Sequence, residues 1–407
     1  MKILFLTDNF PPETNAPASR TFEHARVWVS LGHEVTVITC APNFPTGKVF
    51  DGYKNNWFTR EKIDGIDVIR VKTYITANSG FVRRTLDFIS FMLMGTLAGL
   101  FVKRPAVVVA TSPQFFTAIA GWFVAFARRR PFVFELRDIW PASLSAVGLK
   151  QPEVLFYIFE KIELFLYRRA SLIVSVTHSF KKNLVGRGID GKKIKTVLNG
   201  TELKNFSSAK SDAEMARKHF GFEEKFVVGY IGTHGMAHSL GNILECAELL
   251  KDYHDISFVF IGEGAEKEKL ETEIARRKLS NVKTFRGQPK SNMPAILSML
   301  DISLVSLRDS KLFKQVIPSK IFESMGAGVP MVVSVPEGEA TQLVVDDGAG
   351  LSCEPDNPEA LANSILRLYK DKELYKEVSA ASLAAGMKYD RETLAKKMLG
   401  LLEEVSN

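Results

Sequence analysis

The segment 317–330, IPSKIFESMGAGVP, carries the side chains best suited to bind a phosphorylated ligand. Pro318 suits the first turn of a helix, where its missing N–H has no hydrogen bond to lose. Such a helix start offers free backbone N–H groups and a partial positive charge to an anion, to which Ser319 and Lys320 add a hydroxyl and an ammonium. Glu323 follows about one turn later on a similar face. The pattern fits the diphosphate and ribose of a sugar nucleotide, although an ordinary, well-capped amphipathic helix would read the same.

Loops that follow strand-like runs in the second half of the chain could complete a nucleotide site. The loop after FVVGYIG reads THGMAH, in which His234 and His238 could donate hydrogen bonds to phosphate and Gly235 permits a close backbone approach. Single histidines are more often structural, so both interpretations of this pair stay open. The runs ISFVFIG and VKTFRG lead into EGA and QPK. The donor-binding residues expected from these loops and from the helix are Gly232, Thr233, His234, Gly235, His238, Gly262, Gln288, Ile317, Ser319, Lys320 and Glu323.

Two loops in the first half also follow apolar runs. PPETNAPASR is long and polar, and its small residues, among them Asn15 and Ala16, could let a diphosphate approach the backbone. FELRDIWP at 134–141 places charges at the end of a strand-like run. Asp138 is therefore a candidate general base at the carboxyl end of a strand. The alternative is a local ion pair, in which Arg137 offsets the charge of Asp138.

Short Val- and Ile-rich runs alternate with helix-length segments along the chain, which is typical of doubly wound parallel sheets. The first set covers 2–7, 33–40, 66–74, 106–112, 132–138, 171–176 and 194–199. The second set covers 226–232, 256–262, 282–287, 302–307, 331–335 and 350–353. Helical sequence follows from residue 357, and the polar stretch 200–215 is the predicted interdomain linker. We therefore predict an α/β chain with two doubly wound, Rossmann-like domains.

Composition narrows the classes of function. The chain has 407 residues, of which 46% are hydrophobic and 24% charged, and this suits two globular domains. Its 3 cysteines and 7 histidines show no metal-ligand or disulfide spacing, so we expect no metal site and a reducing compartment. DNFPPE stands where a dinucleotide-binding enzyme has its glycine fingerprint, which argues against a dehydrogenase. No signal peptide is expected at the start of the chain.

Basic residues are in excess in the first half of the chain, and acidic residues are in excess over 206–407. The apolar runs 88–102 and 121–127 are flanked by basic residues, and each is shorter than the roughly 20 residues of a membrane span. They form either buried core helices or a surface that lies on an anionic bilayer. In the second case the membrane contacts come from Arg83, Arg84, Lys103, Arg104, Arg128, Arg129 and Arg130. No motif for nucleic-acid binding is present, so no nucleic acid is expected as a partner.

Together these motifs resemble those of the retaining nucleotide-sugar glycosyltransferases of the GT-B fold, glycosyltransferase family 4. The likeness covers nearly the whole chain, through FPPE, LGHEVTVIT, KIKTVLNGTE, FIGEG, NVKTFRG and PSKIFESMGAGVPMVVS. Within the family, the chain is most similar to the N-acetyl-L-fucosaminyltransferase-like branch. The motifs that carry this finer likeness are NAPASR, PNFPTGKVFDGY, ELRDIWPAS and IPSKIFESMGAG.

The resemblance implies a division of labour between two domains that face a cleft. Residues 1–205 would form the acceptor-binding, membrane-facing domain, and residues 206–385 the nucleotide-sugar-binding domain. A C-terminal helix within 386–407 would cross back to the first domain.

The resemblance also implies roles for single residues. Glu323 would hold the ribose, whereas the first glutamate of the family's pair is replaced by Gln315. The family's phosphate-binding Arg and Lys fall at Thr233 and His238, so Lys320 and Lys314 would supply the positive charge. The family's His before Asp is replaced by Arg137, and the acid is retained as Asp138. The resemblance therefore gives Asp138, Arg137 and Lys320 catalytic roles and adds Lys314 to the donor site.

The implied activity is the metal-independent, retaining transfer of an N-acetylated or deoxy hexosamine from a UDP-sugar to a lipid diphosphate-linked saccharide. The setting would be the inner face of a bacterial membrane, with the enzyme cytoplasmic and peripherally attached, during synthesis of a surface polysaccharide such as O-antigen or capsule. No cofactor is expected besides the donor substrate. Two alternatives remain: a GT-B enzyme such as a UDP-sugar 2-epimerase, which needs no acceptor, and a non-catalytic membrane scaffold, which needs no nucleotide.

Overall fold

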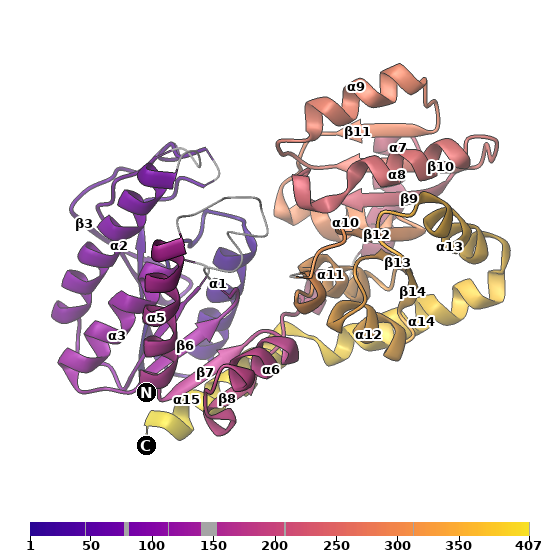
Figure 1. The fold of residues 1–407 in the computed structure, drawn as a ribbon. Coiled ribbons are helices and arrows are strands. Elements are labelled where there is room, and N and C mark those ends of the chain that lie inside the picture. The colour runs from indigo at the N-terminus through magenta and orange to yellow at the C-terminus, as the bar shows by residue number, and fades with distance from the viewer. Residues whose placement is uncertain are drawn as a thin grey trace. The chain divides into compact units, whose positions relative to one another are not determined.

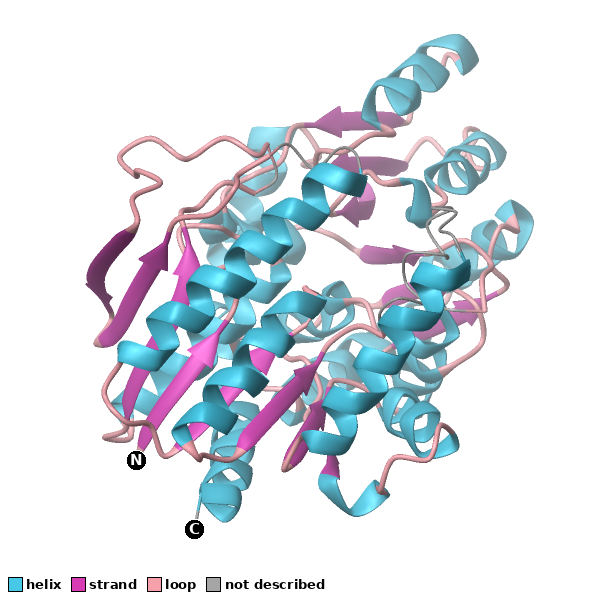
Figure 2. Cartoon of the chain, turned by 60° about the vertical axis from the view of Figure 1, so that its left-hand side comes forward, coloured by secondary structure: helices cyan, strands magenta, loops and turns pink. Residues whose placement is uncertain are grey.

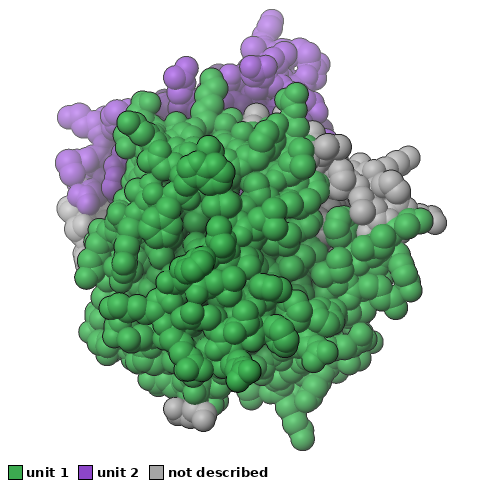
Figure 3. All heavy atoms as spheres, turned by 90° about the vertical axis from the view of Figure 1, so that its left-hand side faces the viewer, with its two compact units in different colours: residues 1–198, 391–407 green, residues 199–390 purple. Residues whose placement is uncertain are grey.

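The structure is a computed structural model of the chain, and it describes residues 1–44, 46–76, 81–112, 114–139, 153–206, 209–311 and 313–406. The chain divides into two units, shown in two colours in Figure 3. Unit 1 comprises Met1–Leu198 with Arg391–Asn407, and unit 2 comprises Asn199–Asp390. Residue 45 of the PNFPTGKVFDGY motif and the last four residues of ELRDIWPAS lie outside the described residues.

Unit 1 is built on an eight-stranded sheet with the order β3-β4-β2-β1-β5-β6-β7-β8. The strands are β1 (Lys2–Leu6), β2 (Glu34–Cys40), β3 (Phe58–Ile63), β4 (Ile66–Val71), β5 (Val107–Thr111), β6 (Phe132–Leu136), β7 (Leu172–Ser175) and β8 (Ile194–Thr196). All neighbours are parallel except β3 and β4. The parallel strands therefore end at one edge, where ligand-binding loops are found in such sheets.

Helices cover both faces of this sheet. They are α1 (Ala16–Ser30), α2 (Phe81–Phe101), α3 (Phe115–Arg128), α5 (Glu153–Arg169), α6 (His178–Gly186) and α15 (Arg391–Ser406). Leu4 on one face packs into a core with residues of α2, α3 and α5, which lie side by side (Figures 1 and 2). Phe5 on the other face packs into a core with Trp28 of α1 and Met398 of α15. The alternation of buried neighbours is what a strand covered on both faces requires.

The β3–β4 hairpin is absent from the sequence prediction. The two strands pair antiparallel, with Ile63 opposite Ile66. Asp64 and Gly65 form the turn with φ angles of 46° and 83°. A two-residue hairpin loop needs such positive φ angles, and Asp-Gly is one of the pairs that adopts them most readily. The strand-like sequence of β3 was hidden by its polar alternation, since FTREKI is exposed on one side.

Unit 2 repeats the architecture around a six-stranded sheet with the order β11-β10-β9-β12-β13-β14. All neighbouring pairs are parallel. The strands are β9 (Phe226–Ile231), β10 (Ile256–Ile261), β11 (Val282–Phe285), β12 (Ile302–Ser306), β13 (Met331–Ser334) and β14 (Gly350–Cys353). The helices are α7 (Ala209–Phe220), α8 (Leu240–Leu249), α9 (Lys267–Arg277), α10 (Met293–Ser298), α11 (Ser319–Ala327), α12 (Glu339–Asp346), α13 (Pro358–Lys370) and α14 (Lys372–Lys388). The predicted strands of this half all occur.

The predicted interdomain linker at 200–215 begins next to the boundary between the units, but its second half is helical. A 3₁₀ turn occupies Leu203–Phe206, and α7 begins at Ala209. The polar surface of α7 explains the error, because an amphipathic helix with few apolar residues resembles a linker in composition. The units divide after Leu198 and again before Arg391.

Helix α15 returns the chain to unit 1, as the GT-B resemblance implied. Trp28 of α1 donates its indole N–H to the carbonyl of Ala395 at 2.9 Å. Arg391 forms a buried ion pair with Glu23 of α1. Helix α15 therefore completes one face of the first sheet.

Helix α2 extends beyond the apolar run 88–102 noted in the sequence, because it begins at Phe81. Its segment Arg83–Phe101 has a mean hydropathy of 1.3, and 22% of the apolar stretch within this segment is buried. Among the described residues, α2 is the helix whose length and composition would allow a membrane crossing. These two properties are weak grounds for a span, because core helices share them.

Candidate functional site

Helix α11 begins where the sequence predicted an anion cradle. Pro318 is its N-cap, and Gly328 ends it with a φ of 67°, an angle that glycine adopts without steric cost. Gly326 lies inside the helix, where a Cβ would come 2.7 Å from the side chain of Thr201. The helix follows β12, so its first turn lies at the carboxyl edge of the sheet of unit 2.

Lys320 is the charged residue at the centre of this edge. Its ammonium is buried and has no hydrogen-bond partner among the described residues. It lies 3.7 Å from the ring centroid of Tyr230, at the end of β9. Burial lowers the pKa of Lys320 to about 7, although the charge of Glu323 opposes the shift. A buried cation that rests on an aromatic face and makes no hydrogen bond to the described residues is well placed to bind an anion.

Two histidines flank the same tyrosine. The ring centroids of His234 and His238 lie 6.0 and 5.9 Å from that of Tyr230. Neither nitrogen of His234, nor Nδ1 of His238, has a hydrogen-bond partner among the described residues. Burial lowers the pKa of each histidine to about 4, with a further contribution from Lys267 for His234 and from Lys320 for His238. Both imidazoles are therefore neutral at pH 7. The single N–H of His238 is directed to the backbone of Ser306, whereas that of His234 is available to a ligand.

Glycines let the loops of β9 and β10 approach each other closely. A Cβ on Gly262 would lie 1.8 Å from the carbonyl oxygen of Gly232. A Cβ on Gly264 would lie 2.3 Å from the carbonyl oxygen of His234. The amide of His234 donates to the carbonyl of Glu263 at 2.8 Å. These contacts fix the backbone on which His234 is carried.

The remaining predicted donor-site residues of unit 2 lie on the same edge but differ in exposure. Thr233 is exposed, and its carbonyl accepts a hydrogen bond from the Tyr230 hydroxyl at 2.8 Å. Gly235 precedes a 3₁₀ turn, Met236–His238. The Gln288 amide donates to the carbonyl of Arg286 at 3.2 Å.

The approach to α11 holds the other predicted residues. Lys314 is exposed in a 3₁₀ turn, Phe313–Gln315, and its backbone packs against Gly338. Ile317 is buried, whereas Ser319 and Glu323 are half-buried. The structure thus gathers Lys320, His234 and His238 around Tyr230, a residue that sequence reasoning did not select.

Tyr230 could have been found from one signal. It is the polar aromatic of FVVGYIG, an otherwise aliphatic strand, and it stands two residues before Gly232 at the strand end. A buried tyrosine usually brings its hydroxyl to a partner at a strand terminus. Here the hydroxyl is tied to the backbone of Thr233, and the ring face is left for Lys320.

In unit 1, Ser112 organises the candidate catalytic pair at the end of β6. Its hydroxyl accepts hydrogen bonds from the amides of Arg137 at 2.8 Å and Asp138 at 3.1 Å. The Arg137 guanidinium donates to the carbonyl of Pro17 at 3.2 Å. Burial lowers the pKa of Arg137 to about 10, and the charge of Glu135 opposes the shift. Arg137 is therefore connected to the loop that carries the predicted diphosphate contacts.

That loop is rigidly built. The Asn15 side chain accepts a hydrogen bond from the amide of Ala18 at 2.9 Å and donates one to the side chain of Asn9. Ala16 is the first residue of α1. Asn15 is therefore the N-cap of the helix and not a free surface amide.

Acidic residues that the sequence reasoning missed lie near the same edge of unit 1. Burial raises the pKa of Asp8, which follows β1. Burial and the charge of Asp8 raise the pKa of Asp87, on α2, to about 7. The Glu13 carboxylate accepts hydrogen bonds from the amides of Asn43 and Phe44, each at 2.8 Å. Glu13 is thus a structural anchor, whereas Asp8 and Asp87 share a low-polarity environment.

Within the described ranges, no group of three or more His, Cys, Asp or Glu side chains is arranged to hold a metal ion. Lys320 and the N-terminus of α11 both bring positive charge to the carboxyl edge of the sheet of unit 2.

Two family models match the chain. "Glycosyl transferase 4-like domain" matches residues 15–200, and "Glycosyl transferases group 1" matches residues 211–383. WcaI of Escherichia coli (strain K12), named as a colanic acid biosynthesis glycosyl transferase, is 25% identical over 401 residues, or 93% of this chain and 97% of WcaI. WbjE of Pseudomonas aeruginosa, named as a glycosyltransferase, is 24% identical over 237 residues, or 58% of each chain.

Solved structures share the fold. HepE of Anabaena, crystallised with UDP and glucose, superposes with a TM-score of 0.75 and 19% identity over 99% of both chains. This likeness confirms the predicted fold, in which each of two domains is Rossmann-like, as in GT-B proteins.

Proposed function

Because this chain is a glycosyltransferase of family 4 with the GT-B fold, we propose that it transfers a sugar from a UDP-sugar to a lipid-linked saccharide. The names of WcaI and WbjE and the UDP complex of HepE support the reaction class and the donor. The process we propose is the synthesis of a bacterial surface polysaccharide, and the finer assignment is the N-acetyl-L-fucosaminyltransferase-like branch. The sugar transferred is then an N-acetylated or deoxy hexosamine.

The observation that carries the proposal is the buried ammonium of Lys320 at the N-terminus of α11, which has no hydrogen-bond partner within the described part of the chain. Burying a charged group without a partner costs free energy, and an anion bound beside Lys320 would offset that cost. Neutral His234 and His238 flank the Tyr230 ring on which Lys320 rests, and His234 adds an N–H there. A diphosphate has the negative charge and the acceptor oxygens that would complement these donors.

In the proposed reaction, the bond between the sugar and the diphosphate breaks and negative charge grows on the leaving oxygen. Lys320, His238 and the first amides of α11 stabilise that charge, which is the role otherwise given to a metal ion. Removing one such preorganised donor costs about 2.7–4 kcal/mol of transition-state stabilisation in other enzymes. Glu323 accepts hydrogen bonds from the ribose hydroxyls.

The acceptor side of the proposal rests on Asp138 and Arg137 in unit 1. Asp138 orients or deprotonates the attacking hydroxyl, and Arg137 binds the transferred sugar. We propose attack from the face that the diphosphate leaves, which retains the configuration of the sugar. Asp138 and Arg137 sit on amides anchored by the Ser112 hydroxyl, so their backbone is preorganised.

We propose that unit 1 rests on the inner face of the cell membrane, with the chain otherwise cytoplasmic. Leu86, Leu93, Leu97 and Phe101 form an exposed stripe along one face of α2. The predicted basic contacts divide into two kinds. Arg83, Lys103, Arg104 and Arg129 are exposed, whereas Arg84, Arg128 and Arg130 are half-buried.

The guanidinium of Arg128 stabilises the fold and is not free to contact lipid. It donates to the carbonyls of Leu100 and Val102 at 2.8 Å, and it therefore closes the end of α2. The exposed arginines and lysine remain to contact anionic lipid.

Thermal unfolding in the presence of UDP, GDP, dTDP or NAD tests the donor assignment. A ligand at 100 times its Kd stabilises the folded state by about 2.7 kcal/mol, and we expect this shift for UDP alone. Lys320→Ala should remove the UDP shift, and its matched control Lys311→Ala, on an exposed lysine of the same loop, should keep it. A shift with NAD, or no shift with any nucleotide, would contradict the proposal. Turnover of a UDP-sugar without acceptor would indicate the epimerase alternative.

A further inference from the structure

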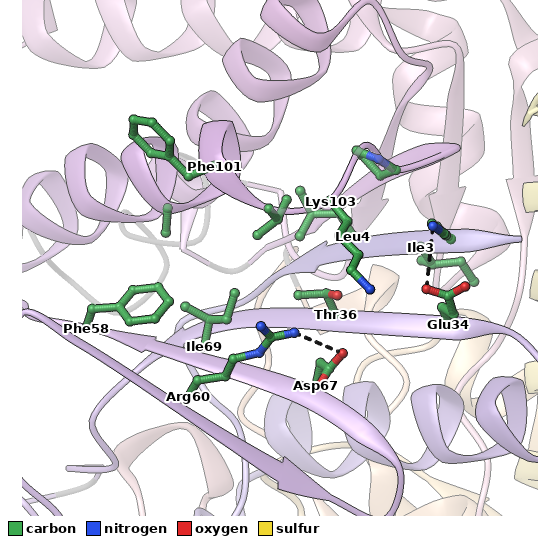
Figure 4. A pocket seen from close by; sticks show the side chains of 14 residues that line it. Ile3, Leu4, Glu34, Thr36, Phe58, Arg60, Asp67, Ile69, Phe101 and Lys103 are labelled. Atoms are coloured by element: carbon green, nitrogen blue, oxygen red, sulfur yellow. Dashed lines mark ion pairs between the residues drawn. The ribbon is translucent and has the colours of Figure 1, made fainter.

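A pocket of about 170 Å³ lies between the end of α2 and the sheet of unit 1 (Figure 4). Leu4, Thr36 and Ile69 form its floor on three neighbouring strands. Ala98 and Phe101 line it from α2. An apolar cavity of about 150 Å³ accepts a guest of the size of benzene, so this pocket holds a ring or a short alkyl segment.

The pocket is apolar at one end and cationic at the other. Phe101 is 83% exposed and Phe58 is 56% exposed, and these two rings lie at the apolar end. Lys103 points into the pocket toward Thr36 (Figure 4). Lys103 has no ion-pair partner among the described residues.

The other charges around the pocket already have partners. Lys2 pairs with Glu34 at 3.7 Å, and Arg60 pairs with Asp67 at 3.3 Å. The unmatched charge of the pocket is therefore the single ammonium of Lys103. A ligand that matches this pocket has one anionic group and an apolar chain.

The pocket lies far from the proposed reaction site of unit 1. Lys2, Glu34 and Asp67 stand at or near the amino ends of β1, β2 and β4, whereas Asp138 follows the carboxyl end of β6. The reacting end of an acceptor binds at the carboxyl edge, so this pocket does not serve that end.

The pocket is also continuous with the exposed apolar stripe of α2. Phe101 is the last member of that stripe and at the same time a lip of the pocket. Any bilayer that the stripe touches brings lipid chains to the opening, and Lys103 and Arg104 meet the phosphate layer there.

We propose that this pocket binds one anionic phospholipid of the membrane, with part of an acyl chain between Phe58 and Phe101 and the phosphate on Lys103. The proposal rests on the proposed membrane contact of unit 1 and deepens it. A bound lipid would fix the position of unit 1 on the bilayer, in addition to the less specific attraction of the basic surface.

The test uses lipids that stay monomeric in water, so that binding to the pocket is separated from binding to a bilayer. Dihexanoyl phosphatidylglycerol below its critical micelle concentration is titrated into the full chain by calorimetry, with dihexanoyl phosphatidylcholine as the zwitterionic comparison. We expect the anionic lipid to bind at least roughly tenfold more tightly, as one charge-assisted hydrogen bond would give.

Three variants locate the site. Ala98→Met fills the pocket from α2 and should abolish binding, and Lys103→Glu should weaken it by about tenfold or more without touching the core. Leu86→Ser is the matched control, because it changes the same stripe about 22 Å away along the helix axis. It should lower binding to anionic vesicles and leave the monomeric lipid unaffected.

Several results would overturn the proposal. They are no binding of monomeric phosphatidylglycerol, equal binding of the zwitterionic lipid, or unchanged binding in both Ala98→Met and Lys103→Glu. The UDP-induced thermal shift is measured in the same samples. If it persists when lipid binding is absent, the lipid pocket fails and the glycosyltransferase assignment stands.

Discussion

Binding of UDP should be accompanied by uptake of protons by the protein, and the pKa of Lys320 determines the average number taken up per UDP. Burial lowers the pKa of Lys320 to about 7, so about nine-tenths of these side chains are neutral at pH 8 in the ligand-free protein. A diphosphate at the N-terminus of α11 raises the pKa again, because an opposite charge nearby favours the ammonium. From this residue we expect uptake of about 0.9 proton per UDP at pH 8, about 0.5 at pH 7 and about 0.1 at pH 6.

The direction of the pH dependence separates the lysine from the histidines. The pKa values of His234 and His238 lie at about 4, and a diphosphate raises them. Protons taken up by a histidine become more numerous as the pH falls toward that range. Protons taken up by Lys320 become more numerous as the pH rises from 6 to 8. An uptake that grows with pH therefore identifies the lysine.

Calorimetric titration in two buffers with different ionisation enthalpies measures the uptake directly. The affinity for UDP should fall about tenfold for each pH unit above 7, as linkage requires for the uptake of one proton. Lys320→Arg should abolish both effects, because arginine keeps its proton throughout this range. Lys311→Ala should preserve them. An affinity independent of pH between 7 and 9 in the wild-type chain, with no buffer dependence, would refute the reasoning.

Other consequences concern stability. In the folded chain the pKa of Lys320 is below its unfolded value. The free-energy cost of burying the charge is therefore present below pH 7 and disappears as the pH rises toward 10. In urea titrations, Lys320→Met should raise the unfolding free energy by a few kcal/mol at pH 6 and by little at pH 10. Gly262→Ala should destabilise unit 2 by about 3 kcal/mol or more, because the new Cβ meets the carbonyl of Gly232, and the urea midpoint of unfolding should fall. The control Gly241→Ala has open space around the new Cβ and should be neutral or stabilising. Arg391→Met should cost about 3–5 kcal/mol because it removes a cation that faces the buried carboxylate of Glu23, and Glu23→Gln in the same chain should recover part of that loss in a double-mutant cycle.

The sequence predicted the parallel sheets well because their buried strands are continuous aliphatic runs. It missed β3 because that strand lies at the sheet edge and alternates exposed polar residues, although the turn residues Asp64 and Gly65 carried the signal. It misread the start of α7 as a linker, since the packing that holds a mostly polar helix comes from residues far along the chain.

Part of the candidate donor site could also be predicted from the sequence. Lys320 was selected because a lysine in the first turn of a helix adds charge where amides are already free. That its ammonium rests on Tyr230 could not be read from the sequence, because the two residues are ninety positions apart and meet only through the order of β9 and β12 in the sheet. The exposure of Lys314 likewise depends on tertiary packing.

The return of α15 to unit 1 has a consequence for the order of events during protein synthesis. A ribosome makes α1 before unit 2, whereas the residues that cover Trp28 and pair with Glu23 are made after unit 2. Unit 2 lies entirely between these segments, so it can finish folding while the part of the first sheet that α15 covers is still open. The nascent chain thus carries an open apolar surface on unit 1 throughout the synthesis of unit 2, and unit 1 is completed only after unit 2 has been made.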